Sequence, residues 1–365
     1  MVFSTKAAVL REPRERFAIE NVELDDLRSN EVLIRIQACG ICHTDSYAMK
    51  ALSVPSVLGH EGAGLVERVG SSVRSVAPGD SVVVSFPSCG SCANCRSARP
   101  YICESIIDLK FSGARSDGSR SIQADGLAIT SAFFQQSSFA QHAITLETNL
   151  IKVDRTLSPT LLAALPCGVL TGAGAVVNIV QQQKRRSIAV VGVGAVGMSA
   201  IMAAKVIGLR DVVAIDVNPE RLSLAREFGA RLVFDARDPG LDKAIKSSFP
   251  DGIDYVLDTS GNEKAIGNAI SYIAMGGELA LVTVPEPYPS AESHLNQFFM
   301  RAGSLRCVIV GATDPRVFLP WLLQRHARGE FPVDRLIATY PFAEINQAFA
   351  DAKSGKAIKP VLLME

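Results

Sequence analysis

The sequence predicts an α/β chain of two domains, the first mostly β and the second built on a doubly wound parallel sheet. Its 365 residues exceed what one ordinary core holds and suggest two domains of about 150 to 200 residues. In the first half, short strands alternate with Gly and Pro-Gly-Asp turns, whereas from about Leu161 apolar strands alternate with helices. The chain contains no internal repeat and no low-complexity segment.

The first domain is expected to draw on both ends of the sequence. Residues Glu31 to Ala38 (EVLIRIQA) alternate apolar and polar side chains, as in a half-buried strand, and Gly59 to Ser85 hold two more β-rich runs, GLVERVG and DSVVVS. From about Ile309 the tail carries a helical segment, PRVFLPWLLQRHARGEF, and a final strand, KPVLLM. We expect residues 1–168 and 309–365 to form one domain and residues 169–308 the other.

The second domain is expected to alternate strands and helices. Its segments follow in the order SIAVVGVG, AVGMSAIMAAKVIG, DVVAIDV, PERLSLAREFGA, IDYVLDTSG and GGELALVTV. This order is typical of a parallel doubly wound sheet. Ser187 to Ala204 is the one uncharged apolar stretch that could imitate a membrane span, and we interpret it as a buried strand and turn because glycines interrupt it.

The charge balance argues against several classes of partner. Basic and acidic residues number 37 each, so no global field favours nucleic acid, an anionic membrane or an acidic protein. The N-terminal MVFSTKAAVLREPRERF lacks a continuous apolar core, so we expect no export signal and a reducing, cytoplasmic location. Binding must then come from a local site, and the expected partner is a small molecule.

Four clustered cysteines have the spacing of a structural zinc site. The stretch CGSCANCRSARPYIC follows C-x2-C-x2-C-x7-C, which lets four thiolates converge on one tetrahedral ion. Disulfide bridges are the alternative, but they fit a reducing compartment poorly. A nucleic-acid module would require a basic, aromatic-rich face, and this stretch has two arginines. The predicted ligands are Cys89, Cys92, Cys95 and Cys103.

A glycine-rich segment between a strand and a helix predicts a dinucleotide site. Gly192, Gly194 and Gly197 follow the apolar strand Ile188 to Val191 and open a helix. The first permits a tight turn, the second lets the backbone approach a pyrophosphate, and the third allows the helix to pack closely on the strand. The helix N-terminus then faces the negative charge. A tight βα turn without a nucleotide is the alternative.

An acidic residue at the end of the next strand favours NAD over NADP. Asp216 lies 19 residues past Gly197, where a carboxylate can accept hydrogen bonds from the adenosine ribose and would repel a 2′-phosphate. Arg221 lies either over the adenosine or in solvent as an ordinary surface group.

Three separated residues suggest a second, catalytic metal site. Cys42 in GICHTD, His60 in GHEG and Cys167 in LPCG offer two thiolates and an imidazole, which would leave the fourth position of a zinc ion open. Spacing alone does not bring Cys167 to the other two, and a buried free cysteine is the alternative. Cys39 and Cys307 lack such neighbours and are interpreted as apolar fillers.

In combination, these motifs resemble the zinc-dependent alcohol dehydrogenases of the medium-chain dehydrogenase/reductase superfamily. GICHTD, GHEGAGLVERVG, PGDSVV, CGSCANC, CGVLTG, GVGAVG and KPVL occur in the family's order and at its approximate spacing, over essentially the whole chain. The resemblance implies a GroES-like, mostly β catalytic domain with a zinc lobe at about residues 86–110, and a Rossmann NAD-binding domain. It also implies two zinc ions per chain, one catalytic and one structural.

The resemblance further assigns roles around the catalytic zinc. Cys42, His60 and Cys167 would hold the ion, and Glu61 would be a near-ligand that swings toward it during exchange. Asp45 would accept a hydrogen bond from the non-ligating nitrogen of His60 and so set its tautomer. A helix N-cap is the alternative role for Asp45.

Proton transfer is expected to start from the turn after Cys42. Thr44 resembles the family's hydroxyl that takes the substrate proton and passes it to the nicotinamide ribose, with a backbone cap as the alternative. His43 and Lys359 match positions whose basic side chains touch the cofactor pyrophosphate, with an exposed charge as the alternative. Tyr47 stands where family members often have a histidine that ends the relay. A phenol with a pKa near about 10 is a poor proton acceptor, so we hypothesise that His43 or water completes the relay.

Further cofactor contacts are implied by the resemblance alone, at Thr171, Val196, Val282 and Val284. The last two, with Phe86, would form the apolar wall and the nicotinamide face, although each could equally be a core residue.

The subgroup that looks closest is that of the aryl or benzyl alcohol dehydrogenases, because of the segments FSGARSDGS, SSFAQHA and EINQAF. The expected reaction is reversible, NAD-linked oxidation of a primary alcohol with an aromatic or other apolar body. The alternatives are an S-(hydroxymethyl)glutathione (formaldehyde) dehydrogenase and a secondary-metabolite alcohol or aldehyde reductase. A binding or regulatory protein without chemistry is disfavoured by the intact metal and relay residues.

Self-association is also expected from the resemblance. A homodimer or homotetramer would form by edge pairing of a strand near Glu278–Thr283 or near Leu305–Val310.

Overall fold

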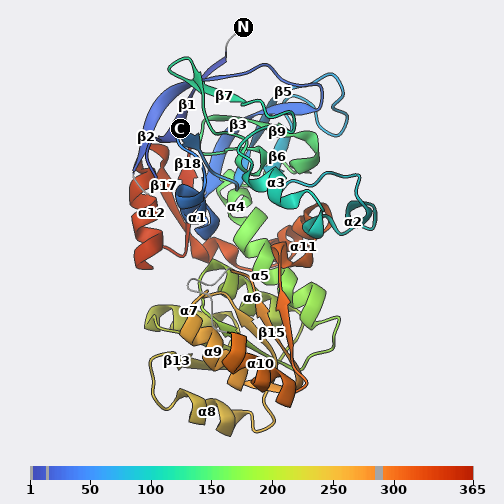
Figure 1. Cartoon of the computed structure of the whole chain (residues 1–365), viewed down its shortest axis with the longest axis vertical. Coiled ribbons are helices and arrows are strands. Elements are labelled where there is room, and N and C mark those ends of the chain that lie inside the picture. Colours follow the sequence, from blue (N-terminus) through green and yellow to red (C-terminus); the bar gives the residue numbers. More distant parts are fainter. Residues whose placement is uncertain (1–2, 14–15, 284–290, 365) are drawn as a thin grey trace. The chain divides into compact units, whose positions relative to one another are not determined.

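The computed structural model describes residues 3–13, 16–283 and 291–364, which form two compact units (Figure 1). Unit 1 comprises Met1–Cys167, Asp314–Leu319 and Val333–Glu365, and unit 2 comprises Gly168–Thr313 and Pro320–Pro332.

This division differs from the predicted one, because residues 309–313 and 320–332 belong to the second unit. For the first of these segments the reason is local. The 3₁₀ turn Val310–Ala312 packs on α5 (Leu170–Gly174), and the Asn178 side chain donates to the carbonyls of Gly311 and Ala312, at 3.2 Å each.

Unit 1 is mostly β, as predicted. One sheet has the order β4-β1-β2-β7-β8, with strands at Ser56–Val57, Phe3–Leu10, Phe17–Leu24, Ile122–Ala124 and Leu127–Ala128. The other has the order β10-β6-β5-β3-β18-β17, with strands at Leu150–Val153, Ser81–Val84, Gly62–Val69, Glu31–Gly40, Lys359–Leu363 and Ile337–Pro341, and with β9 (His142–Leu146) paired to β3.

Strand β3 leads into the functional site. It pairs with β5, β9 and β18, and α4 (Pro159–Ala164) packs on it. Most of β3 is therefore buried, and the polar alternation expected of EVLIRIQA is limited to Arg35 and Gln37. Even Glu31 is buried, because its carboxylate accepts hydrogen bonds from the Arg115 guanidinium.

The tail returns to the first unit, as expected. Strand β18 runs antiparallel to β3, with Val361 opposite Gly40, and parallel to β17. This register brings Lys359 beside Ile41, between the end of β3 and the start of α1. The helices of this unit are α1 (His43–Ala51), α2 (Ala93–Arg96), α3 (Ile106–Phe111), α4 and α12 (Ile345–Ser354), while α11 (Pro315–Ala327) spans the division between the units.

Unit 2 is the predicted doubly wound parallel sheet. Its order is β13-β12-β11-β14-β15-β16, with strands at Leu232–Asp235, Asp211–Asp216, Ser187–Val191, Ile253–Asp258, Ile273–Leu281 and Ser304–Cys307. The helices that accompany it are α6 (Ala195–Val206), α7 (Pro219–Phe228), α8 (Leu241–Ser248), α9 (Glu263–Ser271) and α10 (Ala291–Met300). The order reverses between β11 and β14, which is where such sheets bind nucleotides.

The sheet leaves one of the two predicted association strands unable to pair further. Strand β15, which contains Glu278, lies between β14 and β16, so both of its edges are taken. Strand β16 has a neighbour on one side only among the described residues.

A long apolar helix escaped the sequence analysis. Pro159–Val180 is continuous and apolar enough to cross a membrane by length and composition, but 83% of its most apolar window is buried in the fold, as in a core helix. The helix widens to π geometry at Leu165–Val169 and Ala175–Val180. Pro166 lacks the N–H that an α-helix would use there. Ser187–Ala204, in contrast, forms β11, a turn and most of α6.

Candidate metal and cofactor sites

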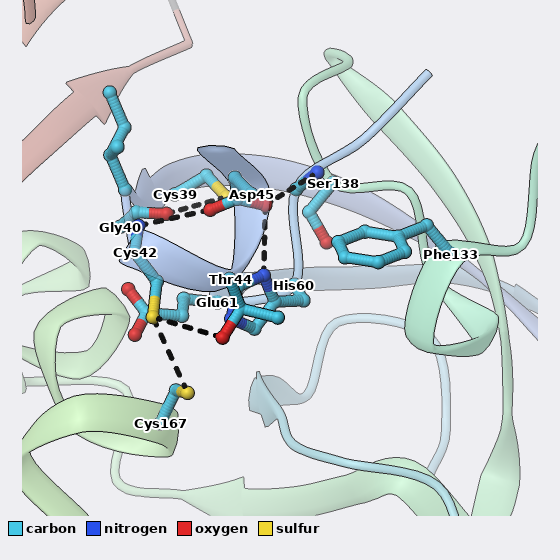
Figure 2. Close-up of polar contacts among 12 residues, drawn as sticks. Cys39, Gly40, Cys42, Thr44, Asp45, His60, Glu61, Phe133, Ser138 and Cys167 are labelled. Atoms are coloured by element: carbon cyan, nitrogen blue, oxygen red, sulfur yellow. Dashed lines mark hydrogen bonds and ion pairs between the residues drawn. The ribbon is translucent and has the colours of Figure 1, made fainter. Parts of the chain in front are cut away.

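Asp45 organises the first turn of α1. Its Oδ2 accepts a hydrogen bond from the backbone N of Cys42 at 2.9 Å, which closes a capping box. Its Oδ1 accepts from Nδ1 of His60 at 2.9 Å and from the backbone N of Gly59 at 3.3 Å (Figure 2). The two roles considered for this residue, helix cap and partner of His60, are therefore both filled by one fully buried carboxylate.

The three predicted zinc ligands converge with Glu61. One donor atom each from Cys42, His60, Glu61 and Cys167 lies within 4.8 Å of the others, and the two sulfurs are 3.7 Å apart (Figure 2). With Asp45 on Nδ1, His60 turns its Nε2 into this cluster, where it is buried and has no hydrogen-bond partner in the described part of the chain. Two thiols and an imidazole whose second nitrogen is held by a carboxylate are the donor set of a catalytic zinc site, so the residues fit the ion.

The protonation equilibria of the cluster reflect this crowding of donors. The hydrogen bond with Cys167 lowers the pKa of the Cys42 thiol, and the same contact, with burial, raises the pKa of Cys167. Burial alone would lower the pKa of His60, but the charge and hydrogen bond of Asp45 raise it to about 10. Negative charge thus gathers on Cys42 at the point where a cation would bind.

Glu61 is held by Lys359 inside unit 1. The two side chains form an ion pair and are almost fully buried, and Lys359 also donates to the carbonyl of Ile41 at 3.4 Å. Burial raises the pKa of Glu61 to about 7, against the opposing charge of Lys359. A Cβ on Gly40 would lie 2.1 Å from the Glu61 carboxylate, so the missing side chain makes room for it.

Lys359 is not an exposed charge, because β18 buries it against Glu61. Its contact with a cofactor pyrophosphate stays a prediction.

The relay residues are only partly brought together. Thr44 Oγ1 accepts a weak hydrogen bond from the Cys42 sulfur at 3.7 Å, so this hydroxyl lies at the metal cluster (Figure 2). His43 is exposed. Tyr47 is 46% exposed and its ring packs edge-on against Phe111, with centroids 6.3 Å apart.

Two phenylalanines that the sequence analysis missed flank His60. The ring centroids of Phe133 and Phe134 lie 5.5 and 4.5 Å from the centroid of the His60 imidazole, and Figure 2 shows Phe133 beside it. The backbone around them is unusual, with positive φ at Ala132, Phe134, Gln135 and Ser137. Strained backbone of this kind is typical of functional sites. The run SAFFQQSS was the available signal, since its polar residues anchor the turn: Gln136 donates to the carbonyl of His60 at 3.0 Å.

The four clustered cysteines also converge. Their donor atoms lie within 4.8 Å of one another and all four are free thiols, which disfavours the disulfide alternative. The backbone N of Cys92 donates to Cys89 Sγ at 3.3 Å and that of Cys95 to Cys92 Sγ at 3.5 Å. Backbone hydrogen bonds lower the pKa of Cys89 to about 6, which favours the thiolate that zinc requires.

Loss of this second cluster is expected to destabilise unit 1. Zinc sites contribute folding free energy, and residues 86–99 contain little regular structure of their own apart from α2. Replacing Cys92 by serine should remove one zinc per chain and lower the Tm by about 5 °C or more. Differential scanning calorimetry with metal analysis measures both, and Ser97→Ala, at an exposed position of the same segment, is the control. An unchanged Tm with a full zinc complement would contradict the assignment.

The glycine loop of unit 2 has the three predicted properties. Gly192 has φ +84°, which favours glycine. A Cβ on Gly197 would lie 2.1 Å from the carbonyl oxygen of Gly192, so only glycine lets α6 pack on β11. A Cβ on Gly194 would meet nothing within 4 Å, and α6 begins there without a side-chain cap. The loop thus leaves a cradle at a helix N-terminus, which fits a dinucleotide pyrophosphate.

Asp216 ends β12 beside this loop. Its Oδ2 accepts from the backbone N of Val193 at 2.7 Å, and its Oδ1 accepts from that of Asn218 at 2.8 Å. The carboxylate therefore ties the glycine loop to the start of α7 and stays 8% exposed.

The remaining predicted cofactor residues lie in unit 2. Arg221 is in the first turn of α7, where its backbone N donates to the Asn218 side chain at 3.1 Å. Thr171 is buried in α5, Val196 is half-buried in the first turn of α6, and Val282 is half-buried at the end of β15. Val284 lies outside the described residues.

Known proteins resemble this chain over nearly its whole length. The family model of the alcohol dehydrogenase GroES-like domain matches residues 28–155, and that of the zinc-binding dehydrogenase matches residues 195–324. The geraniol dehydrogenase of Castellaniella defragrans is 42% identical over 364 residues, with 99% of this chain and 98% of that protein covered. The class-3 alcohol dehydrogenase of Myxine glutinosa is 31% identical over 370 residues, with 99% and 98% covered.

Solved structures show the same likeness over whole chains. An alcohol dehydrogenase zinc-binding domain protein from Burkholderia ambifaria has a TM-score of 0.95 at 38% identity, and the two chains are covered completely. The benzyl alcohol dehydrogenase of Acinetobacter calcoaceticus has a TM-score of 0.94 at 33% identity, again with complete coverage. With its GroES-like and Rossmann-type units and its converging cysteine and histidine donors, this chain belongs to the zinc-dependent alcohol dehydrogenases of the medium-chain dehydrogenase/reductase superfamily.

Proposed function

We propose that the enzyme transfers a hydride reversibly between NAD(H) and a primary alcohol or aldehyde with an aromatic or other apolar body. The observation that carries the proposal is the convergence of Cys42, Cys167 and the unpartnered Nε2 of His60 beside two phenyl rings. Relatives named for geraniol and for benzyl alcohol, both primary alcohols with an unsaturated body, support the substrate class.

The chain's own residues would prepare both the metal and the proton path. When bound, zinc would supply a Lewis acid for the substrate oxygen and NAD a hydride acceptor. Asp45 orients His60 through Nδ1 and leaves Nε2 free to ligate. The Thr44 hydroxyl lies next to the Cys42 sulfur and is placed to take the proton of the alcohol. Phe133 and Phe134 exclude water from the imidazole.

NAD rather than NADP is proposed because of Asp216. Its carboxylate stands at the end of β12 with both oxygens already held by backbone N–H groups. It is therefore in place to accept hydrogen bonds from a ribose and to repel a 2′-phosphate.

A substrate panel with both cofactors tests the proposal. Benzyl alcohol, geraniol, ethanol and S-(hydroxymethyl)glutathione would each be assayed by nicotinamide absorbance with NAD and with NADP, alongside metal analysis. We expect the first two alcohols with NAD to give the highest kcat/KM, and two zinc ions per chain. A preference for the glutathione adduct would favour S-(hydroxymethyl)glutathione dehydrogenase activity instead.

We also propose that the enzyme self-associates through β16, and that it is located in the cytoplasm. Exposed apolar side chains gather around this edge strand, at Met275, Phe299, Met300 and Leu305. An exposed strand edge with apolar neighbours is suited to pairing with a second copy. All eight cysteines are free, which supports a reducing compartment. Light scattering should show a dimer or tetramer, and a monomer would contradict self-association through β16.

A further inference from the structure

A buried lysine close to the metal site has no role in the function described so far. Lys110 lies on α3 and is 7% exposed. Its Nζ stands over two aromatic rings, 5.1 Å from the centroid of Phe134 and 5.5 Å from that of Phe86. Phe134 also packs against the candidate zinc ligand His60, with ring centroids 4.5 Å apart, so the same phenyl ring contacts both the ammonium and the imidazole.

The structure offers this ammonium no conventional partner. Among the described residues, Lys110 forms no hydrogen bond and no ion pair. Burial lowers the pKa of Lys110 to about 8, so the cation persists at neutral pH.

Such an arrangement is costly unless something else completes it. An ammonium group has three N–H donors, and burying it without an acceptor is unfavourable. The cation–π contacts with Phe86 and Phe134 offset only part of that cost and provide no hydrogen-bond acceptor for the N–H groups. No carboxylate pairs with Lys110 among the described residues. In contrast, the buried cations Arg115 and Lys359 pair with Glu31 and Glu61.

We propose that Lys110 is a specificity residue of the alcohol site, which binds a carboxylate at the far end of the substrate's apolar body. This inference rests on the proposed function and deepens it. Lys110 and His60 both contact the ring of Phe134, so a para-substituted benzylic body lying along that ring would reach from the metal cluster to the ammonium. The preferred substrates would then be hydroxymethyl or formyl compounds that carry an anionic group opposite the reacting carbon.

Two alcohols that differ only in the remote group test the proposal. They are 4-(hydroxymethyl)benzoate and 4-methylbenzyl alcohol, assayed with the wild type and with Lys110→Met, which keeps length but removes charge. We expect Lys110→Met to lower kcat/KM for the carboxylate by about 30-fold or more, roughly 2 kcal/mol, mainly through KM. The methyl compound should be turned over equally well or better. Equal losses on the two alcohols would overturn the proposal.

Control variants and a binding measurement separate the possible failures. Lys110→Arg should keep most of the carboxylate preference, and Lys152→Met, at an exposed position of the same unit, should leave both alcohols unaffected. Calorimetric titration without cofactor should show that 4-formylbenzoate binds more tightly than 4-methylbenzaldehyde to the wild type but not to Lys110→Met. If the wild type oxidised neither alcohol while this difference persisted, the proposed function would fail and the inference on Lys110 would stand. If Lys110→Met did not fold, Lys110→Gln would take its place in both measurements.

Discussion

Replacing Cys167 by alanine is expected to remove one zinc ion per chain and to lower kcat/KM by at least about 10³-fold. Its sulfur lies 3.7 Å from that of Cys42, and both face the unpartnered Nε2 of His60. Without it, one thiolate and one imidazole remain, together with a Glu61 already paired to Lys359. That set is too small to hold zinc tightly.

The readouts for this variant are zinc per chain by mass spectrometry, kcat/KM, and the thermal transition. Cys307→Ala is the matched control, because Cys307 is exposed and belongs to unit 2. The control should keep both zinc ions and full activity. A Cys167→Ala enzyme with two zinc ions and unchanged kcat/KM would refute the catalytic site as drawn in Figure 2.

Two glycines of the cofactor loop should respond to substitution in opposite ways. Gly194→Val is expected to leave the fold intact, at a cost of about 1 kcal/mol or less at the helix start, because Gly194 has φ −77° and an added Cβ meets nothing within 4 Å. The side chain would instead fill the cradle and weaken NAD binding by about 100-fold. Gly197→Ala should destabilise the fold by about 1–3 kcal/mol, because its Cβ would lie 2.1 Å from the Gly192 oxygen.

Urea unfolding and calorimetric NAD titration distinguish the two effects. The prediction requires Gly194→Val to lose affinity with at most a small shift of its unfolding midpoint, and Gly197→Ala to lose stability first. If Gly194→Val bound NAD like the wild type, the dinucleotide would not approach the backbone at this turn. If Gly197→Ala were as stable as the wild type, α6 would not pack on β11 as described.

Whether a feature of this protein could be predicted from the sequence depended on how far apart its residues lie along the chain. The tetracysteine cluster was predictable because its residues lie in one short segment. The glycine loop and Asp216 were predictable because they belong to one βαβ unit. In such segments the spacing along the chain largely sets the spacing in space. The same holds for Asp45 and Cys42, which share the first turn of α1.

Other features depended on pairings that no local pattern reveals. The burial of Lys359 against Glu61 had no local signal in the sequence, because it depends on the pairing of β18 with β3. Phe134 and Lys110 belong to different segments that meet only when α3 packs on Phe133–Gln135. Their shared position around His60 is therefore a property of packing.

By itself, then, the sequence determined the α/β class, the tetracysteine cluster and the glycine turn, each through short-range geometry that propensity and spacing control. Only the tertiary structure decided that Cys167, 125 residues from Cys42, joins the candidate metal cluster, that Lys359 pairs with Glu61, and that β16 rather than β15 lies at an edge of the sheet among the described residues. Such long-range contacts follow from how buried surfaces fit together, and that fit depends on the whole core rather than on any one segment.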